Sequence, residues 1–234
     1  MTQWAMPLKP PDFDQWFAAS AGVDPDGTRF ALHQDTGLLW LPSGRLVATQ
    51  PRGVPDPGQY AFIQTVSPGR YSVGLLIEEY PVRPGPGAAA PGPAVEYVAA
   101  ARLVIRDEPA AAWEMALRPG QDASDLNEDS FFGFPVDGGT ACFTDAQTML
   151  TLDALEIPDT DGESWFEVLS MDVSDSGASL VTLTDPGQDE APVVAGFRTG
   201  SGDGSYPTWV GRTAQGDITC FATDFMLARA RPAR

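Results

Sequence analysis

The sequence predicts an α+β fold dominated by β-structure, an antiparallel twisted sheet or sandwich with a few short helices. The chain of 234 residues contains Gly 24 and Pro 22, which favours many turns and therefore many short elements. Segments that alternate between apolar and polar residues recur between these turns, as is typical of half-buried strands. Hydrophobic residues make up 43% of the chain, so we expect a single domain over residues 1–234 around a sizeable core.

The first eighty residues are expected to form one short helix followed by strands. Phe13, Trp16 and Phe17 have helical spacing within Asp12–Ala21, which predicts a helix packed on the core. The expected strands are Thr28–Gln34, Gly37–Leu41, Arg45–Gln50, Tyr60–Val66 and Arg70–Glu79. The single histidine, His33, lies in the first of these strands, where a structural or exposed role is typical.

The middle of the chain begins with a low-complexity segment rich in Pro, Gly and Ala at residues 81–93. We expect this segment to be a mobile surface loop, because the β-pattern resumes directly after it at Val95–Arg106. Pro109–Arg118 is expected to be a helix, since Pro109 suits a first helical turn. Gln121–Ser130 is then expected to be an acidic loop.

A first glycine-rich stretch follows at Phe131–Phe143, where a strand is expected to end at Asp137 before two glycines. Thr140–Phe143 is expected to be a further extended piece. Thr144 and the glutamine three residues later have the spacing of a capping box, which predicts a helix from there to about Leu155.

A second glycine-rich stretch, Gly200–Phe225, closes the predicted sheet. A tight glycine turn leads into one strand, a turn at Gln215–Asp217 reverses the chain, and a second strand follows. Between the two stretches the expected elements are a helix at Ser164–Met171 and strands at Ser179–Thr184 and Val193–Thr199.

The composition is strongly acidic, with a net charge of -18. This charge argues against a nucleic-acid ligand, because phosphates require Lys and Arg. Two explanations for the charge stay open: it serves solubility, or it serves a basic protein partner. The N-terminus lacks the basic and apolar regions of a signal peptide, and no apolar run is long enough to span a membrane, so we expect a cytoplasmic protein with reduced thiols.

Four aspartates beside the turns of the two glycine-rich stretches are the candidate catalytic residues: Asp137, Asp145, Asp203 and Asp224. If the stretches lie side by side, converging carboxylates can act as general acid and base, or bind Mg²⁺ or Ca²⁺ through oxygen ligands. The alternative is that each aspartate only shapes a turn or a helix start. No metal site is predicted from spacing, and no cofactor is expected unless the acids converge.

The candidate binding residues all lie in the second glycine-rich stretch: Ser201, Tyr206, Trp209 and Arg212. They are suited to a small polar ligand, although their alternation also fits a strand with one buried and one exposed face. Cys142 is either a nucleophile near a helix start or a buried structural thiol, and the shortage of histidine favours the structural role.

Several motifs together resemble one bacterial family, the domain of unknown function 4241. They occur in the order LPSGRLVA at 41–48, PGRYSV at 68–73, VDGGTACFTD at 136–145, GSGDGSYP at 200–207, and Asp224–Phe225. The likeness runs from about Leu39 to Leu227. It implies a bacterial cytosolic protein, and it supplies no catalytic residues, because the family has no established activity.

Two hypotheses about function follow. The first is an acidic protein-interaction module of the immunity or toxin-neutralising type, which predicts an acidic face and no deep pocket. The second is a small-molecule enzyme, a hydrolase or a lyase, that uses carboxylates or a divalent metal. It predicts that carboxylates among Asp137, Asp145, Asp203 or Asp224 lie within reach of each other in a pocket.

Overall fold

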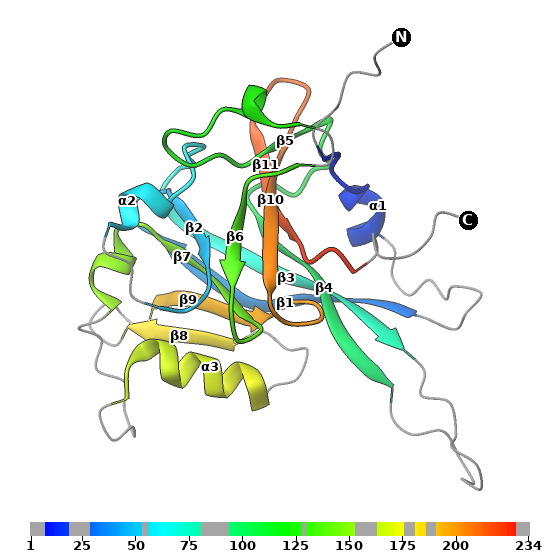
Figure 1. Cartoon of the computed structure of the whole chain (residues 1–234). Coiled ribbons are helices and arrows are strands. Elements are labelled where there is room, and N and C mark those ends of the chain that lie inside the picture. The colour runs from blue at the N-terminus through cyan, green and yellow to red at the C-terminus, as the bar shows by residue number, and fades with distance from the viewer. Residues whose placement is uncertain are drawn as a thin grey trace, which may run out of the picture.

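The chain folds into two antiparallel sheets with helices on their outer sides (Figure 1), as described by a computed structural model. The structure describes residues 8–18, 29–52, 56–80, 94–127, 130–152, 163–175, 181–185 and 191–227, with the backbone alone for Ala18 and for 29–36. The elements in chain order are α1 (Phe13–Ala18), β1 (Arg29–Leu41), β2 (Leu46–Thr49), α2 (Pro57–Tyr60), β3 (Gly69–Tyr80), β4 (Val95–Val104), β5 (Ala112–Met115), η1 (Ala123–Asp125), β6 (Gly133–Val136), β7 (Thr140–Asp145), η2 (Thr148–Leu150), α3 (Trp165–Asp175), β8 (Val181–Asp185), β9 (Ala191–Arg198), β10 (Gly204–Arg212) and β11 (Ile218–Asp224).

The larger sheet has the strand order β1-β3-β4-β11-β10-β5, with β6 also paired to β10. The smaller sheet has the order β2-β7-β9-β8. Every strand pair is antiparallel. The predicted fold class, β-dominated α+β with a few short helices, is therefore confirmed, and the sandwich is the form that it takes.

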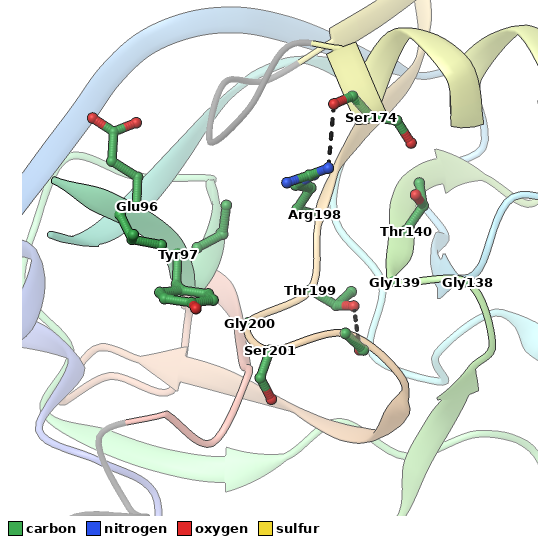
Figure 2. A pocket seen from close by; sticks show the side chains of 13 residues that line it. Glu96, Tyr97, Gly138, Gly139, Thr140, Ser174, Arg198, Thr199, Gly200 and Ser201 are labelled. Carbon is green, nitrogen blue, oxygen red and sulfur yellow. Dashed lines mark hydrogen bonds between the residues drawn. The ribbon is translucent and has the colours of Figure 1, made fainter. Parts of the chain in front are cut away.

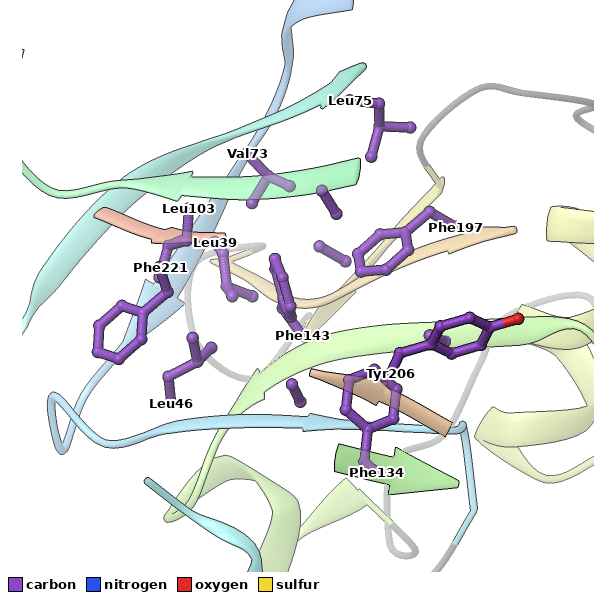
Figure 3. Close-up of a cluster of buried hydrophobic side chains, with 14 of the residues drawn as sticks. Leu39, Leu46, Val73, Leu75, Leu103, Phe134, Phe143, Phe197, Tyr206 and Phe221 are labelled. Carbon is purple, nitrogen blue, oxygen red and sulfur yellow. The ribbon is translucent and has the colours of Figure 1, made fainter. Parts of the chain in front are cut away.

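The main core lies between the two sheets and is filled by one face of nearly every strand (Figure 3). Alternation along a strand decides which residues reach it. In β7, Ala141 and Phe143 point into this core while Cys142 points to the other side. Phe143 packs edge-on against Phe197 of β9, with ring centroids 4.9 Å apart. Burial of these large side chains is the main favourable term for the fold.

A helix covers the outer face of each sheet. Phe13 and Phe17 of α1 pack on the larger sheet beside Trp209, which points outward from β10. Trp165 and Leu169 of α3 pack on the smaller sheet. The molecule therefore has four layers, with α1, the larger sheet, the smaller sheet and α3 in that order.

Most predicted strands are confirmed, and most of their residues are buried, because one face of each sheet meets the main core and a helix packs on the other. The two strands predicted around His33 form the single strand β1, with a register shift between His33 and Gly37. The predicted helices near residues 13 and 165 are also confirmed. Ser164 and Glu167 form the capping box of α3, in which the Ser164 N–H donates to the Glu167 carboxylate at 3.0 Å.

The predicted strand Tyr60–Val66 is wrong, because its backbone bonds to several segments instead of one partner strand. Asp56 caps the short helix α2, and its carboxylate accepts a hydrogen bond from the Gly58 N–H at 3.0 Å. Phe62 then donates to the Leu46 carbonyl and Ile63 to the Leu117 carbonyl.

The predicted helix Pro109–Arg118 is also wrong, since this segment contains the edge strand β5. Met115 pairs with Trp209, and Ala112 pairs with Arg212. The open side of β10 supplies hydrogen-bond partners that outweigh the helix propensity of the alanines.

The helix predicted to begin at Thr144 is wrong at its start. β7 continues through Asp145, because Thr144 pairs with Val47 on one side and Val194 on the other. A short 3₁₀ turn, η2, follows, and residues 153–155 of the predicted helix lie outside the described part of the chain.

The predicted mobile loop at residues 81–93 also lies outside the described residues. Among the helices that the structure does describe, none has the length and apolar character needed to cross a membrane.

The contact between α3 and the smaller sheet yields a test of the layer arrangement. A Cβ added at Gly196 would lie 2.7 Å from Cδ1 and 2.9 Å from Cγ of the buried Leu169. We expect Gly196→Ala to lower the free energy of unfolding by about 1–3 kcal/mol through this overpacking, as measured by urea denaturation. In a Leu169→Ala background the same substitution should be much less destabilising, so strictly additive effects would contradict the arrangement.

Candidate functional site

A polar pocket of about 360 Å³ lies where the two glycine-rich stretches meet (Figure 2). Its walls are the start of β4, the turn before β7, the end of α3 and the connection from β9 to β10. The lining residues are Val95, Glu96, Tyr97, Val98, Gly138, Gly139, Thr140, Ser174, Arg198, Thr199, Gly200, Ser201 and Gly202.

A single carboxylate joins the two glycine-rich turns. Asp203 accepts hydrogen bonds from the backbone N–H groups of Gly138 and Gly139, at 2.6 and 3.0 Å. The Thr199 N–H donates to the Gly139 carbonyl at 3.0 Å, which adds a backbone link between the same turns. Gly139 also approaches Gly202 so closely that a Cβ on Gly139 would lie 3.4 Å from the Gly202 Cα. The pocket wall is therefore fixed in place by bonds within the protein.

The turn from Thr199 to Gly202 is held from several sides. The Gly200 N–H donates to the Val98 carbonyl of β4 at 3.0 Å. The Tyr206 hydroxyl donates to the Gly202 carbonyl at 2.7 Å. Gly200 has a φ of 44° and a Cβ there would come within 3.0 Å of Phe225, so both backbone conformation and space require glycine.

The pocket contains one cationic and one acidic side chain, Arg198 and Glu96. Arg198 donates a hydrogen bond from its guanidinium to the carbonyl of Ser174, near the end of α3, at 3.2 Å. Neither Arg198 nor Glu96 forms an ion pair with any side chain in the described part of the chain. Both are exposed, so each has charge available for a ligand.

The structure brings some of the predicted acids together and separates another. Asp137 and Asp203 lie at the paired glycine turns, and the Asp137 carboxylate is exposed. Asp224 is fully buried at the end of β11, where it accepts a hydrogen bond at 2.8 Å from the N–H of Met226, whose φ is 64°. This bond stabilises a turn conformation that non-glycine residues rarely adopt.

Asp145 lies at the opposite end of β7, about 20 Å from the glycine turn at roughly 3.3 Å per residue. It is fully buried and organises the turn before β2. Its carboxylate accepts hydrogen bonds from the Ser43 hydroxyl at 2.8 Å, the Ser43 N–H at 3.1 Å and the Gln147 N–H at 2.7 Å. The four aspartates therefore do not share one cleft, and Asp145, Asp203 and Asp224 each stabilise a turn.

Of the predicted binding residues, Ser201 lines the pocket. Tyr206 is buried in the core, and its hydroxyl donates a hydrogen bond to the Gly202 carbonyl of the turn that lines the pocket. Trp209 is buried on the outer face of the larger sheet, beside α1. Arg212 pairs with Glu114 at 2.6 Å at the far end of β10.

Cys142 is fully buried between the smaller sheet and α3, and burial raises the pKa of its thiol. Burial also raises the pKa of Cys220. These environments fit structural thiols instead of nucleophiles. Among the described residues, no group of three or more His, Cys, Asp or Glu side chains is arranged to hold a metal ion.

The sequence did not single out Arg198, Glu96 or Tyr97 as site residues. Arg198 directly precedes the Thr199–Gly202 turn at the end of a predicted strand, which is a position where functional side chains often lie. Glu96 and Tyr97 are brought to the pocket by strand pairing across the larger sheet, which no local pattern reports.

Residues 39–223 match a protein family described as protein of unknown function (DUF4241). The match contains the smaller sheet, both glycine-rich turns and every residue that lines the pocket. No curated protein and no solved structure gives a significant match.

The link between the glycine turns can be tested at Asp203. Asp203→Ala removes the acceptor of two backbone N–H groups, so we expect a loss of about 1–3 kcal/mol in the free energy of unfolding. Amide hydrogen exchange at Gly138 and Gly139 should become faster. The matched control is Asp137→Ala, because this neighbouring carboxylate is exposed and accepts no hydrogen bond from the described residues. Equal effects of the two substitutions would refute the role given to Asp203.

The buried thiols make a pH-dependent prediction. A raised pKa keeps the proton on sulfur, so at pH 8 both cysteines should react with a disulfide reagent far more slowly than free cysteine. Since the folded state holds this proton more tightly, the free energy of unfolding should fall as the pH rises above the ordinary value of 9.0. Mass spectrometry of labelled peptides in native and denatured samples gives the measurement. Rapid native labelling of Cys142 would contradict its burial under α3.

Proposed function

The chain belongs to the DUF4241 family, and we propose that it binds a small polar ligand in the pocket between its two glycine-rich turns. The observation that carries this proposal is the convergence of both turns on one cavity that also contains unpaired polar and charged side chains. The same convergence explains why two segments far apart in the sequence are rich in glycine.

The dimensions and lining of the pocket support ligand binding. Its volume of about 360 Å³ falls within the range of about 300–1,000 Å³ that is common for small-molecule sites. The hydroxyls of Tyr97, Thr140 and Ser201 form no hydrogen bonds with the described residues, and so can bind a ligand. The walls are held by internal hydrogen bonds, which lowers the entropy lost on binding.

We propose that the pocket binds a ligand, and we assign no chemical reaction to it. Acid/base catalysis by paired carboxylates, as in the hydrolase or lyase hypothesis, needs two acids within reach of the same substrate. None of the four candidate aspartates is among the residues that line the pocket, and Asp137, although exposed, lies beside an Asp203 carboxylate that already accepts two backbone hydrogen bonds. Mg²⁺ or Ca²⁺ would need a similar cluster of oxygen ligands.

A titration followed by amide NMR tests the proposal with three probes of equal chain length: butyrate, n-butylammonium and 4-aminobutyrate. We expect at least one probe to shift the amide resonances of Gly138, Gly139 and Ser201 in a saturable manner. Ser201→Trp should abolish these shifts by filling the pocket, and Ser124→Trp, on an exposed turn elsewhere, should leave them intact. If no probe produces saturable shifts, or if both variants behave like the unsubstituted chain, the proposal fails.

A second candidate function rests on the outer face of α3. Its exposed side chains include Glu167, Met171, Asp172 and Asp175, and α3 has no basic residue in its last turn. Acids at the C-terminal end of a helix oppose the helix dipole and are therefore unfavourable for stability. This unfavourable placement favours a role in binding. We propose that this face binds a basic protein, in an immunity or toxin-neutralising type of interaction, with the overall charge of -18 assisting association.

The double variant Asp172→Asn/Asp175→Asn tests this second function. It should raise the free energy of unfolding by about 0.3–1 kcal/mol per substitution at low salt, because the repulsion with the helix dipole is removed. It should also lose a basic protein that the unsubstituted chain captures from the cytosol of its source at low salt. Glu108→Gln/Asp125→Asn removes the same charge outside α3 and should retain that protein. Equal capture by both variants would exclude α3 as the docking face.

A further inference from the structure

We infer that the pocket between the glycine-rich turns selects a zwitterion, a small molecule with one carboxylate and one ammonium group. The inference rests on the proposed binding function and adds the class of ligand. It follows from the opposite charges of Arg198 and Glu96, from the lack of an ion pair between them, and from the charge of the whole chain.

Arg198 provides the anion-binding side. In Figure 2 one nitrogen of its guanidinium is bonded to Ser174. The guanidinium lies on the side of Arg198 that faces Glu96 and Tyr97. A guanidinium has five N–H donors, so the single bond to Ser174 leaves several free for a carboxylate. The bond to α3 also fixes the orientation of the side chain, which reduces the entropy lost when a ligand binds.

Glu96 provides the cation-binding side. It is the one carboxylate among the lining residues, and it lies on the opposite wall from Arg198. Because these two charges do not pair with each other, the space between them is available to a ligand that contacts both. Such a ligand replaces the solvation of each charge by an oppositely charged partner.

The surrounding charge disfavours a simple anion. The chain has Asp+Glu 32 against Lys+Arg 14, so acids greatly outnumber basic residues over the molecule as a whole. A bare carboxylate would be repelled by these acids and would leave Glu96 unpaired. A bare ammonium would be attracted by them but would leave Arg198 unpaired. A zwitterion satisfies both side chains without adding net charge.

Isothermal titration calorimetry at low ionic strength tests the inference with 4-aminobutyrate, butyrate and n-butylammonium. Glycine and 6-aminohexanoate extend the zwitterion series to shorter and longer charge separations. We expect one zwitterion to bind at least about tenfold more tightly than butyrate or n-butylammonium, equivalent to about 1.4 kcal/mol. The exposed positions of both charged residues allow their neutral variants to fold, which circular dichroism checks.

The variants separate the two halves of the site. Arg198→Gln should weaken the best zwitterion and butyrate alike, by about tenfold or more. Glu96→Gln should weaken the zwitterion to a similar degree while leaving butyrate unchanged or tighter. Glu108→Gln, an exposed acid outside the pocket, should change neither affinity.

The possible results distinguish this inference from the function on which it rests. If butyrate binds as tightly as every zwitterion and depends only on Arg198, the pocket binds anions and the zwitterion inference is wrong. If n-butylammonium matches the zwitterions and depends only on Glu96, the pocket binds cations and the inference is equally wrong. If none of the five probes binds, the ligand-binding function itself fails together with the inference.

Discussion

The structure depends on a chain of aromatic contacts that crosses from one sheet to the other. Successive ring centroids are 4.9, 5.9, 5.1 and 6.4 Å apart along Phe143, Phe197, Phe225, Tyr206 and Phe134. This series of aromatic rings begins in the smaller sheet and ends in the larger one, so its packing sets the separation of the two sheets. Phe225 also lies against Gly200, and Tyr206 bonds to Gly202. The packing of the core therefore determines the position of the turn that forms the pocket wall.

The parts of the fold that sequence patterns predicted are those whose cause is local. β3, β4, β9, β10 and β11 are segments of mostly apolar residues between turn residues, which is visible in the sequence, and most of their residues are buried. β5 could not be predicted in this way, since Ala112–Met115 is extended only because β10 offers an open edge. The continuation of β7 through Thr144 has the same origin, because strands on both sides pair with it.

In the candidate site, too, the features with a local cause were predictable from the sequence, and those that depend on distant segments were not. The two glycine-rich turns and Asp203 were visible in the sequence, because positive φ angles and tight turns require particular residue types. The sequence did not show what Asp203 bonds to, and its bonds to Gly138 and Gly139 span 65 and 64 positions of chain. Arg198 was not identified either, since an arginine at a strand end becomes informative only when the opposite wall is known. Asp145 was selected by the same reasoning as Asp203. It lies at the opposite end of β7 from the glycine turn that Asp203 binds, and it stabilises the turn before β2.

The wide sequence separation of the pocket walls has a consequence for how the protein folds. Segments near residues 96, 139, 174 and 200 must all be in place before the cavity exists, so we expect it to form only after the long-range strand pairings. Partly folded chains would then lack the proposed binding site. A ligand at a hundred times its dissociation constant would then add about 2.7 kcal/mol to the native state alone. If the proposed binding holds, the concentration of the ligand would influence how much of the newly made chain survives proteolysis, which would link the abundance of this protein to the supply of that ligand.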